Sequence, residues 1–424
     1  MSEIKWGCIQ PLTGGMYIGA LKATGCNARW IINYPGHCSI KYKNNEVTSV
    51  GNQANLLNWM KKNKCEVPIY TLDRTMFQGG HDMSPKYIDD KTPDFTDMDL
   101  VVAVPVCSGL SAITIASDDT KSTKNNNMAW ITEYTLNVIK PKVYIFENAP
   151  ALASDKGADM RKELEDIART AGYAVAYFKT DTVLHHNCQK RQRTFAVFFK
   201  YRNMAECAPV LNFVADTIDC NTYFDMIPAD ATQQIEFKMS SFNQALLAYM
   251  VARYGENWQT TTNRPYVFVE MCQNRMGSIR DFRAFIMNEY KADTETKTKI
   301  WMQLDHVEEK LAEGKNFYLP ALTIYKNYTP SIQFKSLQCL LHHKHNRLLT
   351  VREALWLMGM PHDFELLGDI EMNGPEIGQN VPVATAEYIV SEAVRIINEW
   401  DAIEREPGDN AVIYDNIKRK TTKI

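Results

Sequence analysis

The run Leu100-Val101-Val102-Ala103-Val104, followed by Pro105-Val106-Cys107, decides the fold. A continuous apolar run of this length, ended by a proline, is typical of a strand that is buried on both faces of a sheet. Strands of this kind belong to parallel sheets covered by helices, and ligand sites lie at their carboxyl ends. The run therefore predicts an α/β fold with Cys107 at the edge of the sheet.

The rest of the first 200 residues repeats a strand–helix alternation. Further strands are predicted at 5–10, 28–33, 67–72, 142–146, 174–179 and 194–199. Helices are predicted at 15–24, 53–62, 128–139 and 160–171. The alternation indicates a doubly wound, mostly parallel, Rossmann-like sheet with helices on both faces.

The alternation stops near residue 201 and regular structure resumes near residue 346. The stretch between is rich in Asn, Gln, Thr, Tyr and Met, with helical patterns only at 242–254 and 301–315. A long amphipathic helix is predicted at 384–400. A chain of 424 residues is too long for one ordinary core. We therefore expect a first domain at 1–200, a smaller irregular domain at 201–345, and a segment at 346–424 that returns to the first.

Composition narrows the class of protein. The chain has 45% hydrophobic residues, a net charge of −3 and ten cysteines without C-x-x-C spacing. Reduced thiols, no signal-peptide pattern and no membrane-length apolar run favour a cytoplasmic protein without a metal site or membrane partner. A viral and a bacterial origin both stay open. The net charge predicts no general affinity for nucleic acid, although a local basic face is allowed.

Two other segments also adjoin predicted strands and are considered together with the Cys107 segment. Glu147-Asn148 follows the strand at 142–146, and Gln189-Lys190-Arg191-Gln192-Arg193 precedes the strand at 194–199. Each alone has an ordinary structural explanation, such as a core thiol, a turn or a solvated edge. Together they supply a thiol, an acid and two guanidiniums, which suit attack on a pyrimidine ring.

In this order, the three segments resemble the cytosine-C5 DNA methyltransferases, whose pattern reads Pro-Cys, Glu-Asn-Val and Gln-x-Arg-x-Arg. The resemblance implies that Cys107 attacks C6 of a flipped cytosine, that Glu147 acts at N3, and that Arg191 and Arg193 are the catalytic cations. It also implies S-adenosylmethionine or a related donor as cofactor, and double-stranded DNA as partner.

The resemblance extends to most of the chain. Gly14-Gly15-Met16-Tyr17-Ile18-Gly19 looks like the first family motif, 347–353 like part of the ninth, and 377–383 like the tenth. The resemblance implies that 1–200 is the catalytic domain and 201–345 the target-recognition domain. It also implies that the last helix lies beside the first strand. The implied donor-binding residues are Gln10, Leu12, Gly14, Gly15, Asn33, Asp73, Pro105, Gln379 and Asn380.

The departures from the family pattern cluster in the donor-binding half, although beside Cys107 the residue Val106 also replaces a proline and Ala103-Val104 replace two glycines. Gln10 replaces an aromatic residue, Leu12 a glycine, Asn33 an acidic residue and Gln379 an asparagine. One explanation is a rebuilt pocket that still takes S-adenosylmethionine. The other is an altered one-carbon donor, or loss of the donor with base recognition retained.

Two alternatives to a DNA methyltransferase stay open at this point. One is modification of an RNA cytosine, and the other is a non-catalytic subunit that binds nucleic acid. Candidate phosphate or base contacts in the insert are Arg264, Arg275, Arg280, Lys335, His342, His343, Lys344, His345 and Arg347.

Overall fold

The computed structural model describes residues 3–33, 40–43, 46–51, 53–72, 87, 91–105, 110, 127–200, 211–262, 264–315, 319, 321–333, 336–368, 370–399 and 412–415. Among the predicted site residues, Asp73 and Cys107 lie outside these ranges, as does the candidate contact Lys335. No helix within the described ranges is long and apolar enough to span a membrane.

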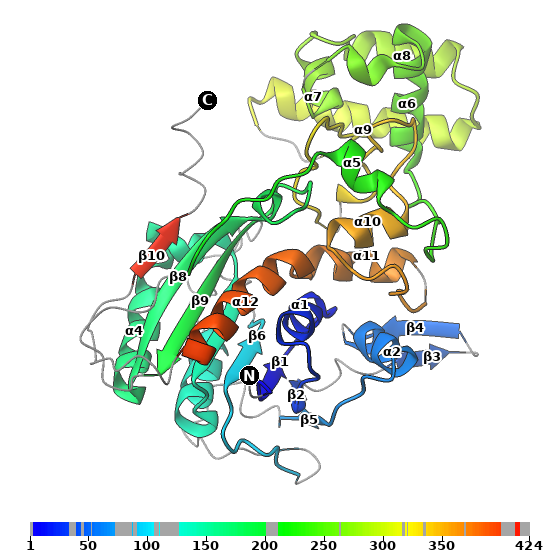
Figure 1. Cartoon of the computed structure of the whole chain (residues 1–424). Coiled ribbons are helices and arrows are strands. Elements are labelled where there is room, and N and C mark those ends of the chain that lie inside the picture. The colour runs from blue at the N-terminus through cyan, green and yellow to red at the C-terminus, as the bar shows by residue number, and fades with distance from the viewer. Residues whose placement is uncertain are drawn as a thin grey trace.

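An eight-stranded sheet forms the centre of the described structure, with the strand order β10-β8-β9-β7-β6-β1-β2-β5 (Figure 1). Its strands are β1 (Trp6–Ile9), β2 (Trp30–Asn33), β5 (Ile69–Thr71), β6 (Leu100–Ala103), β7 (Val143–Asn148), β8 (Tyr173–Asp181), β9 (Gln192–Lys200) and β10 (Val412–Asp415). Only β9 runs antiparallel to its neighbours, β7 and β8. The predicted mostly parallel α/β sheet is confirmed. A separate antiparallel pair joins β3 (Ile40–Lys43) to β4 (Glu46–Val50).

Helices cover both faces of the sheet, which explains why its strands are continuously apolar. Val143 and Ile145 of β7 face the layer that contains α1 (Gly15–Thr24), α2 (Ala54–Lys62) and α12 (Val383–Glu399). Tyr144 and Phe146 of the same strand face the other layer. That layer contains a helical segment at 127–139, with a π-helical end η2 (Thr135–Ile139), and α4 (Ala158–Ala171).

The last helix returns to the start of the chain, as the family resemblance implied. In Figure 1, α12 lies along α1 beside the sheet. The approach is close, since a Cβ on Gly19 of α1 would be 2.6 Å from the Cβ of Ala386 in α12. Two helices that are far apart in the sequence, α1 and α12, therefore pack side by side in the first domain.

The stretch after β9 contains a helical lobe, shown in green to yellow at the top of Figure 1. It includes α5 (Cys220–Asp225), α6 (Ser241–Tyr254), α7 (Val267–Cys272), α8 (Ile279–Asn288) and α9 (Thr294–Ala312). Aromatic rings form its core, with Phe282 of α8 lying 5.8 Å from Phe242 and 5.3 Å from Tyr249. The stretch with the irregular sequence pattern therefore forms helices of 6 to 19 residues, and several of them begin at capping residues such as Ser240 and Asp293.

Position 345, the predicted end of the second domain, lies inside packed structure. Residues that follow it pair with the lobe, since the N–H of Phe237 donates to the carbonyl of Leu349 (3.2 Å) and that of Val351 to Ile235 (2.8 Å). Here α10 (Val351–Leu357) begins at a capping box formed by Thr350 and Glu353, and α11 (Ile370–Gln379) follows.

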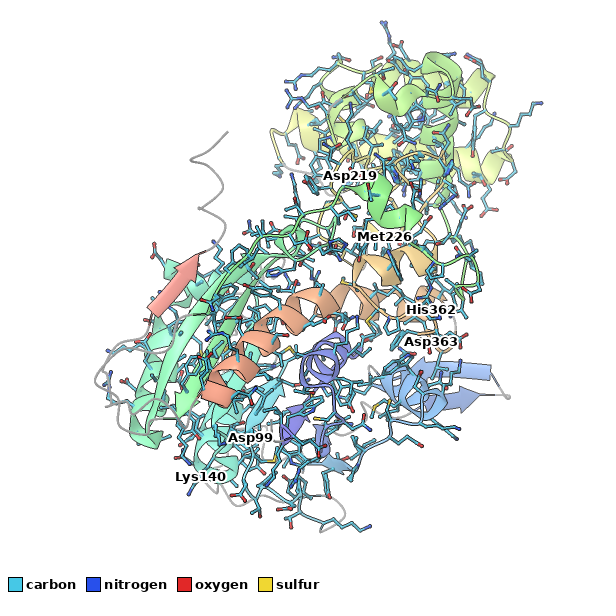
Figure 2. All side chains as sticks on the ribbon, in the orientation of Figure 1. Asp99, Lys140, Asp219, Met226, His362 and Asp363 are labelled. Carbon is cyan, nitrogen blue, oxygen red and sulfur yellow. The ribbon has the colours of Figure 1, made fainter. Side chains whose placement is uncertain are left out.

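The same part of the chain reaches α2 of the first domain. The carboxylate of Asp363, labelled in Figure 2, accepts hydrogen bonds from Trp59 (3.0 Å) and Asn63 (2.9 Å). Short 3-10 turns complete the described elements, at Pro150–Ala153, Asp155–Gly157, Thr182–Leu184 and Trp258–Thr260.

Candidate active site

Glu147 and Arg193 form an ion pair at the edge of the sheet. Glu147 is the fifth residue of β7, and Arg193 is the second of β9, the antiparallel neighbour of that strand. The Nε of Arg193 lies 2.5 Å from the Glu147 carboxylate, and the Glu147 side chain is 7% exposed. Two of the predicted catalytic side chains are thus in direct contact.

The environment of Glu147 acts on its acidity in two directions. Burial raises the pKa of the Glu147 carboxyl above its ordinary value, while the guanidiniums of Arg193 and Arg191 lower it. Burial is the largest effect, so the pKa remains raised. A carboxyl with a raised pKa is better suited than an ordinary one to deliver a proton to a substrate.

Arg191 occupies a different environment from Arg193. Its side chain is 1% exposed, and its terminal nitrogens donate to the carbonyls of Ile332 (2.9 Å), Gly378 (2.7 Å) and Asn380 (3.0 Å). The two guanidiniums predicted as one pair therefore differ, because one contacts Glu147 and the other binds backbone carbonyls.

The edge that carries Glu147 is also the edge from which the chain leaves β6. Ala103 of β6 is the register partner of Phe146 in β7, so Pro105 follows its strand at the same end as Glu147. Cys107 comes two residues after Pro105 but lies outside the described residues. Its role as nucleophile stays a prediction.

The turn between β1 and α1 has an unusual backbone. Gln10 has a φ of 51° and Leu12 a φ of 53°, both in the left-handed region that residues with a side chain seldom adopt. Such strain costs about 1–3 kcal/mol per residue and is concentrated at functional sites. Leu12 therefore keeps the conformation that suits a glycine although the glycine is absent.

Packing explains the two glycines that follow. A Cβ on Gly14 would lie 2.7 Å from the side chain of Leu56, and one on Gly15 would lie 1.8 Å from the carbonyl oxygen of Val381. The N–H of Gly15 donates to Oδ1 of Asn380 (2.8 Å). Gly15 and Asn380 thus hold the start of α1 against the segment after α11. Gln379, in contrast, is exposed.

Buried acceptors gather around this turn, and they fit a ligand with hydrogen-bond donors. Gln10 is 3% exposed, and its Oε1 has no hydrogen-bond partner within the described part of the chain. Asn33, at the carboxyl end of β2, is 1% exposed. The turn, Asn33 and Pro105 lie at the carboxyl ends of adjacent strands, where α/β folds bind their ligands.

Glu376 is a residue that the sequence reasoning missed. It belongs to α11, and its carbonyl accepts a hydrogen bond from the Thr13 hydroxyl of the turn (2.9 Å). Its Oε2 is buried without a partner among the described residues, and burial raises the pKa of its carboxyl to about 7. Only its position three residues before Gln379 could have drawn attention to it.

The candidate nucleic-acid contacts divide into two groups. Arg264, Arg275, Arg280, Lys344 and His345 are exposed. His342 is buried with its Nε2 3.5 Å from the Glu353 carboxylate, and Arg347 binds the same carboxylate through both terminal nitrogens. His342 and Arg347 are therefore engaged by Glu353, with the Arg347 side chain still 26% exposed, and the remaining candidate His343 is half-buried. In the described part of the chain, no set of three His, Cys, Asp or Glu side chains is placed to hold a metal ion.

Comparisons with known proteins agree with the geometry. The family model for C-5 cytosine-specific DNA methylases matches residues 66–395. A protein from an Escherichia coli prophage, assigned as a DNA modification methyltransferase, superposes with a TM-score of 0.53 at 15% identity, covering 93% of this chain and 100% of that one.

Two eukaryotic structures are also similar. The Entamoeba histolytica methyltransferase EhMeth has a TM-score of 0.48 at 11% identity, covering 95% of this chain and 100% of its own. A Spodoptera frugiperda DNMT2 mutant has a TM-score of 0.47 at 12% identity, with coverages of 93% and 100%. No curated protein matches by sequence.

Proposed function

Because this chain belongs to the C-5 cytosine-specific DNA methylases, and is therefore a cytosine-C5 methyltransferase, we propose that it acts on a flipped cytosine in double-stranded DNA with S-adenosylmethionine or a related donor. The observation that carries this proposal is the buried Glu147–Arg193 pair at the carboxyl end of β7. A covalent path through Cys107 completes it.

The proposed reaction begins with the thiolate of Cys107, which adds to C6 of the cytosine. Glu147 gives its proton to N3, so the ring becomes an enamine whose C5 is nucleophilic. When bound, the donor supplies an electrophilic methyl group for C5. The C5 proton then passes to a water molecule, Glu147 takes back the proton from N3, and the Cys107 thiolate leaves C6, which restores the aromatic ring.

Arg193 has two roles in this proposal. Its contact with Glu147 fixes the direction of the carboxyl group, and its charge stabilises the negative charge that develops on the exocyclic oxygen. A planar guanidinium suits both roles because its donors point in several fixed directions.

The donor would be held by Gln10, Leu12, Gly14, Asn33 and Pro105, with Asp73, Gly15, Gln379 and Asn380 as further predicted contacts. The Oε1 of Gln10 is buried without a partner among the described residues, and Asn33 is buried at the carboxyl end of β2 next to this turn. Asn33 can bind a ribose hydroxyl, although without the charge of a carboxylate.

We further propose that 1–200 is the catalytic domain, 201–345 the target-recognition domain, and 346–424 the segment that returns to the first. The helical lobe with its exposed Arg264, Arg275 and Arg280 supports this division. DNA held between lobe and sheet by phosphate contacts would lose affinity steeply as salt is added.

Adduct formation on 5-fluorocytosine tests the proposal. A long duplex made with 5-fluorodeoxycytidine triphosphate presents many sequences at once, and its C5 fluorine blocks the final elimination. We expect a stable protein–DNA adduct in the presence of S-adenosylmethionine, read as a mass shift under denaturing conditions. An adduct on the matching RNA alone would indicate an RNA enzyme, and binding without any adduct would indicate a non-catalytic subunit.

A further inference from the structure

Arg191 lies where three segments distant in the sequence meet. From its position just before β9, it donates to Ile332 on one side and to Gly378 and Asn380 on the other. A guanidinium is planar and its donors have fixed directions, so one side chain sets the relative position of both acceptor segments. Arg191 thereby ties the chain at Ile332 to the end of α11 and to Asn380, the residue after it.

Asn380 extends this connection to the turn before α1. Its backbone oxygen accepts from Arg191, while its side-chain oxygen accepts from the N–H of Gly15. The segment around Asn380 packs tightly on the start of α1, because even a Cβ on Gly15 would overlap the carbonyl oxygen of Val381. Any displacement of 378–381 must therefore displace the start of α1.

Neighbouring amides fix the opposite side of the junction. The side chain of Gln189 donates to the carbonyl of Leu357 (2.9 Å) and accepts from the N–H of Ile332 (3.0 Å). Asn187 donates to the hydroxyl of Tyr223 in α5 (2.9 Å).

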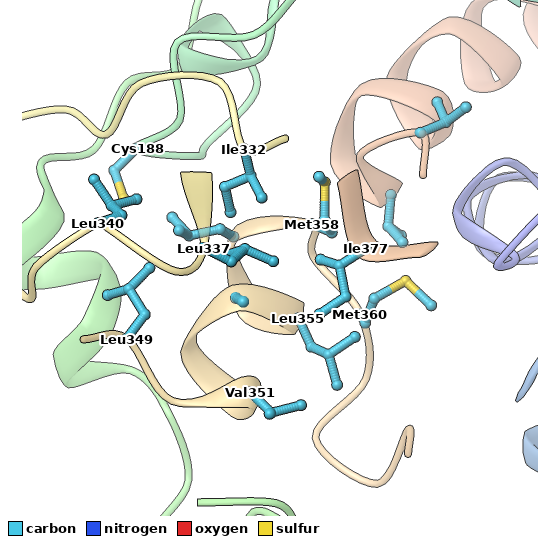
Figure 3. Close-up of a cluster of buried hydrophobic side chains, with 14 of the residues drawn as sticks. Cys188, Ile332, Leu337, Leu340, Leu349, Val351, Leu355, Met358, Met360 and Ile377 are labelled. Carbon is cyan, nitrogen blue, oxygen red and sulfur yellow. The ribbon is translucent and has the colours of Figure 1, made fainter. Parts of the chain in front are cut away.

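Buried apolar side chains surround these polar groups. Figure 3 shows a cluster of such side chains, with Cys188, Ile332, Met358 and Ile377 among those labelled. Cys188 adjoins Asn187 and Gln189 in the sequence, and Ile377 adjoins Gly378. Hydrogen bonds in such surroundings are strong, and they are costly to lose. The lobe and the sheet therefore meet through a stiff polar junction.

We propose that Arg191 is a positioning residue that couples DNA binding by the lobe to donor binding at the turn before α1. DNA that fixes the lobe fixes Tyr223, and the side chains of Asn187 and Gln189 connect Tyr223 to Ile332. Arg191 and Asn380 then transmit this order to Gly15. The inference rests on the proposed function and assigns Arg191 a task distinct from that of Arg193. Coupling of this kind is reciprocal, so the donor must strengthen DNA binding by the same factor.

The affinity of the full chain for S-adenosylhomocysteine, with and without DNA, measures this coupling. Calorimetric titrations would use the fluorocytosine duplex that forms the adduct. For the wild-type protein we expect DNA to tighten binding by about 5-fold or more. Arg191→Lys should reduce this ratio to below about 2-fold, because one ammonium group cannot hold both segments in fixed directions.

Arg352→Lys is the matched control. Arg352 is also fully buried, and it donates to the carbonyls of Thr232 (2.9 Å) and Pro361 (2.8 Å). Neither acceptor belongs to the turn before α1. We expect this variant to keep the wild-type ratio. Asn380→Ala interrupts the same link at Gly15, and it replaces Arg191→Lys if that variant does not fold.

Equal ratios in wild type and in the linking variant would overturn the coupling, as would a wild-type ratio of one. An equal reduction of the affinity ratio in Arg352→Lys would also overturn the coupling, since any buried arginine would then have the same effect. In each of these cases S-adenosylhomocysteine still binds, so the proposed function stands. A wild-type protein that binds no S-adenosylhomocysteine would contradict the proposed donor and the coupling together.

Discussion

The two halves of the site differ in how well their polar groups are satisfied. At the end of β7, Glu147 and Arg193 pair with each other in a buried contact. At the turn before α1, Gln10 and Glu376 carry buried oxygens without partners among the described residues, and Gln10 and Leu12 have strained backbones. Glu147 and Arg193 therefore satisfy each other, although the side-chain nitrogen of Asn148 beside them is also buried without a partner among the described residues. The second half combines unpaired oxygens with backbone strain, which are the features of a site that a ligand completes.

This difference has a physical reason. A general acid must be held in one direction with a shifted pKa before the substrate arrives, and a fixed ion pair achieves this. A donor site can leave polar atoms unpaired, because the ligand offsets their desolvation when it binds. Residues of the first half should therefore govern rate, and those of the second should govern affinity and stability.

Cys107→Ser should have the largest effect. A serine hydroxyl is a far weaker nucleophile than a thiolate near neutral pH, so transfer should be abolished. Binding of DNA should change little, because no charge is removed. Transfer of labelled methyl groups and a gel-shift titration measure the two effects, and undiminished turnover would show that Cys107 is not the nucleophile.

Glu147→Gln should lower kcat by roughly 100-fold or more, since an amide cannot deliver a proton to N3. Because the carboxyl must be protonated to act, the wild-type rate should fall as pH rises through its raised pKa. The variant should lose this dependence on pH. Glu163→Gln, on the exposed side of α4, is the control and should keep both the rate and the profile. A near-normal rate in Glu147→Gln would make Glu147 a structural residue.

The sequence predicted the sheet because its strands are buried on both faces. Runs such as Leu100–Val104 had to be apolar throughout, and the positions of β6 and β7 followed from them. Glu147 and Arg193 could be predicted because each adjoins such a strand. The lobe was harder to predict, since its helices are held together by aromatic contacts between residues that are distant in the sequence rather than by a regular pattern.

What the sequence could not distinguish was the environment of similar residues. Arg191 and Arg193 are two positions apart in one motif, yet they point to backbone carbonyls and to Glu147, respectively. Likewise, the need for glycine at position 15 comes from Val381, which is distant in the chain. These contacts depend on three-dimensional packing, which no local pattern reports.

Asn33→Asp tests the donor half. A charge-assisted hydrogen bond contributes about 1.5–3 kcal/mol, or roughly 10- to 150-fold in affinity. We therefore expect the wild-type protein to bind S-adenosylmethionine weakly and Asn33→Asp to bind it more tightly, while Asn33→Ala should bind it less tightly. Calorimetric titration measures all three. Tight wild-type binding without a gain in Asn33→Asp would show that the substitutions are compensated, and would remove the case for an altered donor.

Glu376→Gln should have the smallest effect, on stability, and only at higher pH. Burial raises the pKa of Glu376 from an ordinary 4.5 to about 7 in the folded protein. Between these values the folded chain binds more protons than the unfolded chain, so its stability falls as pH rises, and above about 7 the loss is complete. Glutamine has the same shape without the charge, so the variant should gain ~1–3 kcal/mol at about pH 8 and almost nothing at about pH 5.

Melting temperatures of wild type and Glu376→Gln at the two pH values measure this gain. A difference in melting temperature that does not depend on pH would show that Glu376 is hydrated rather than buried. Saturation with S-adenosylhomocysteine at the higher pH provides a second comparison. Its ammonium group is a cation that could neutralise Glu376, in which case the ligand should raise the melting temperature of the wild type more than that of the variant. Equal increases would place the ligand's charge away from Glu376, and the unpaired carboxyl would then be a cost of the fold rather than part of the donor site.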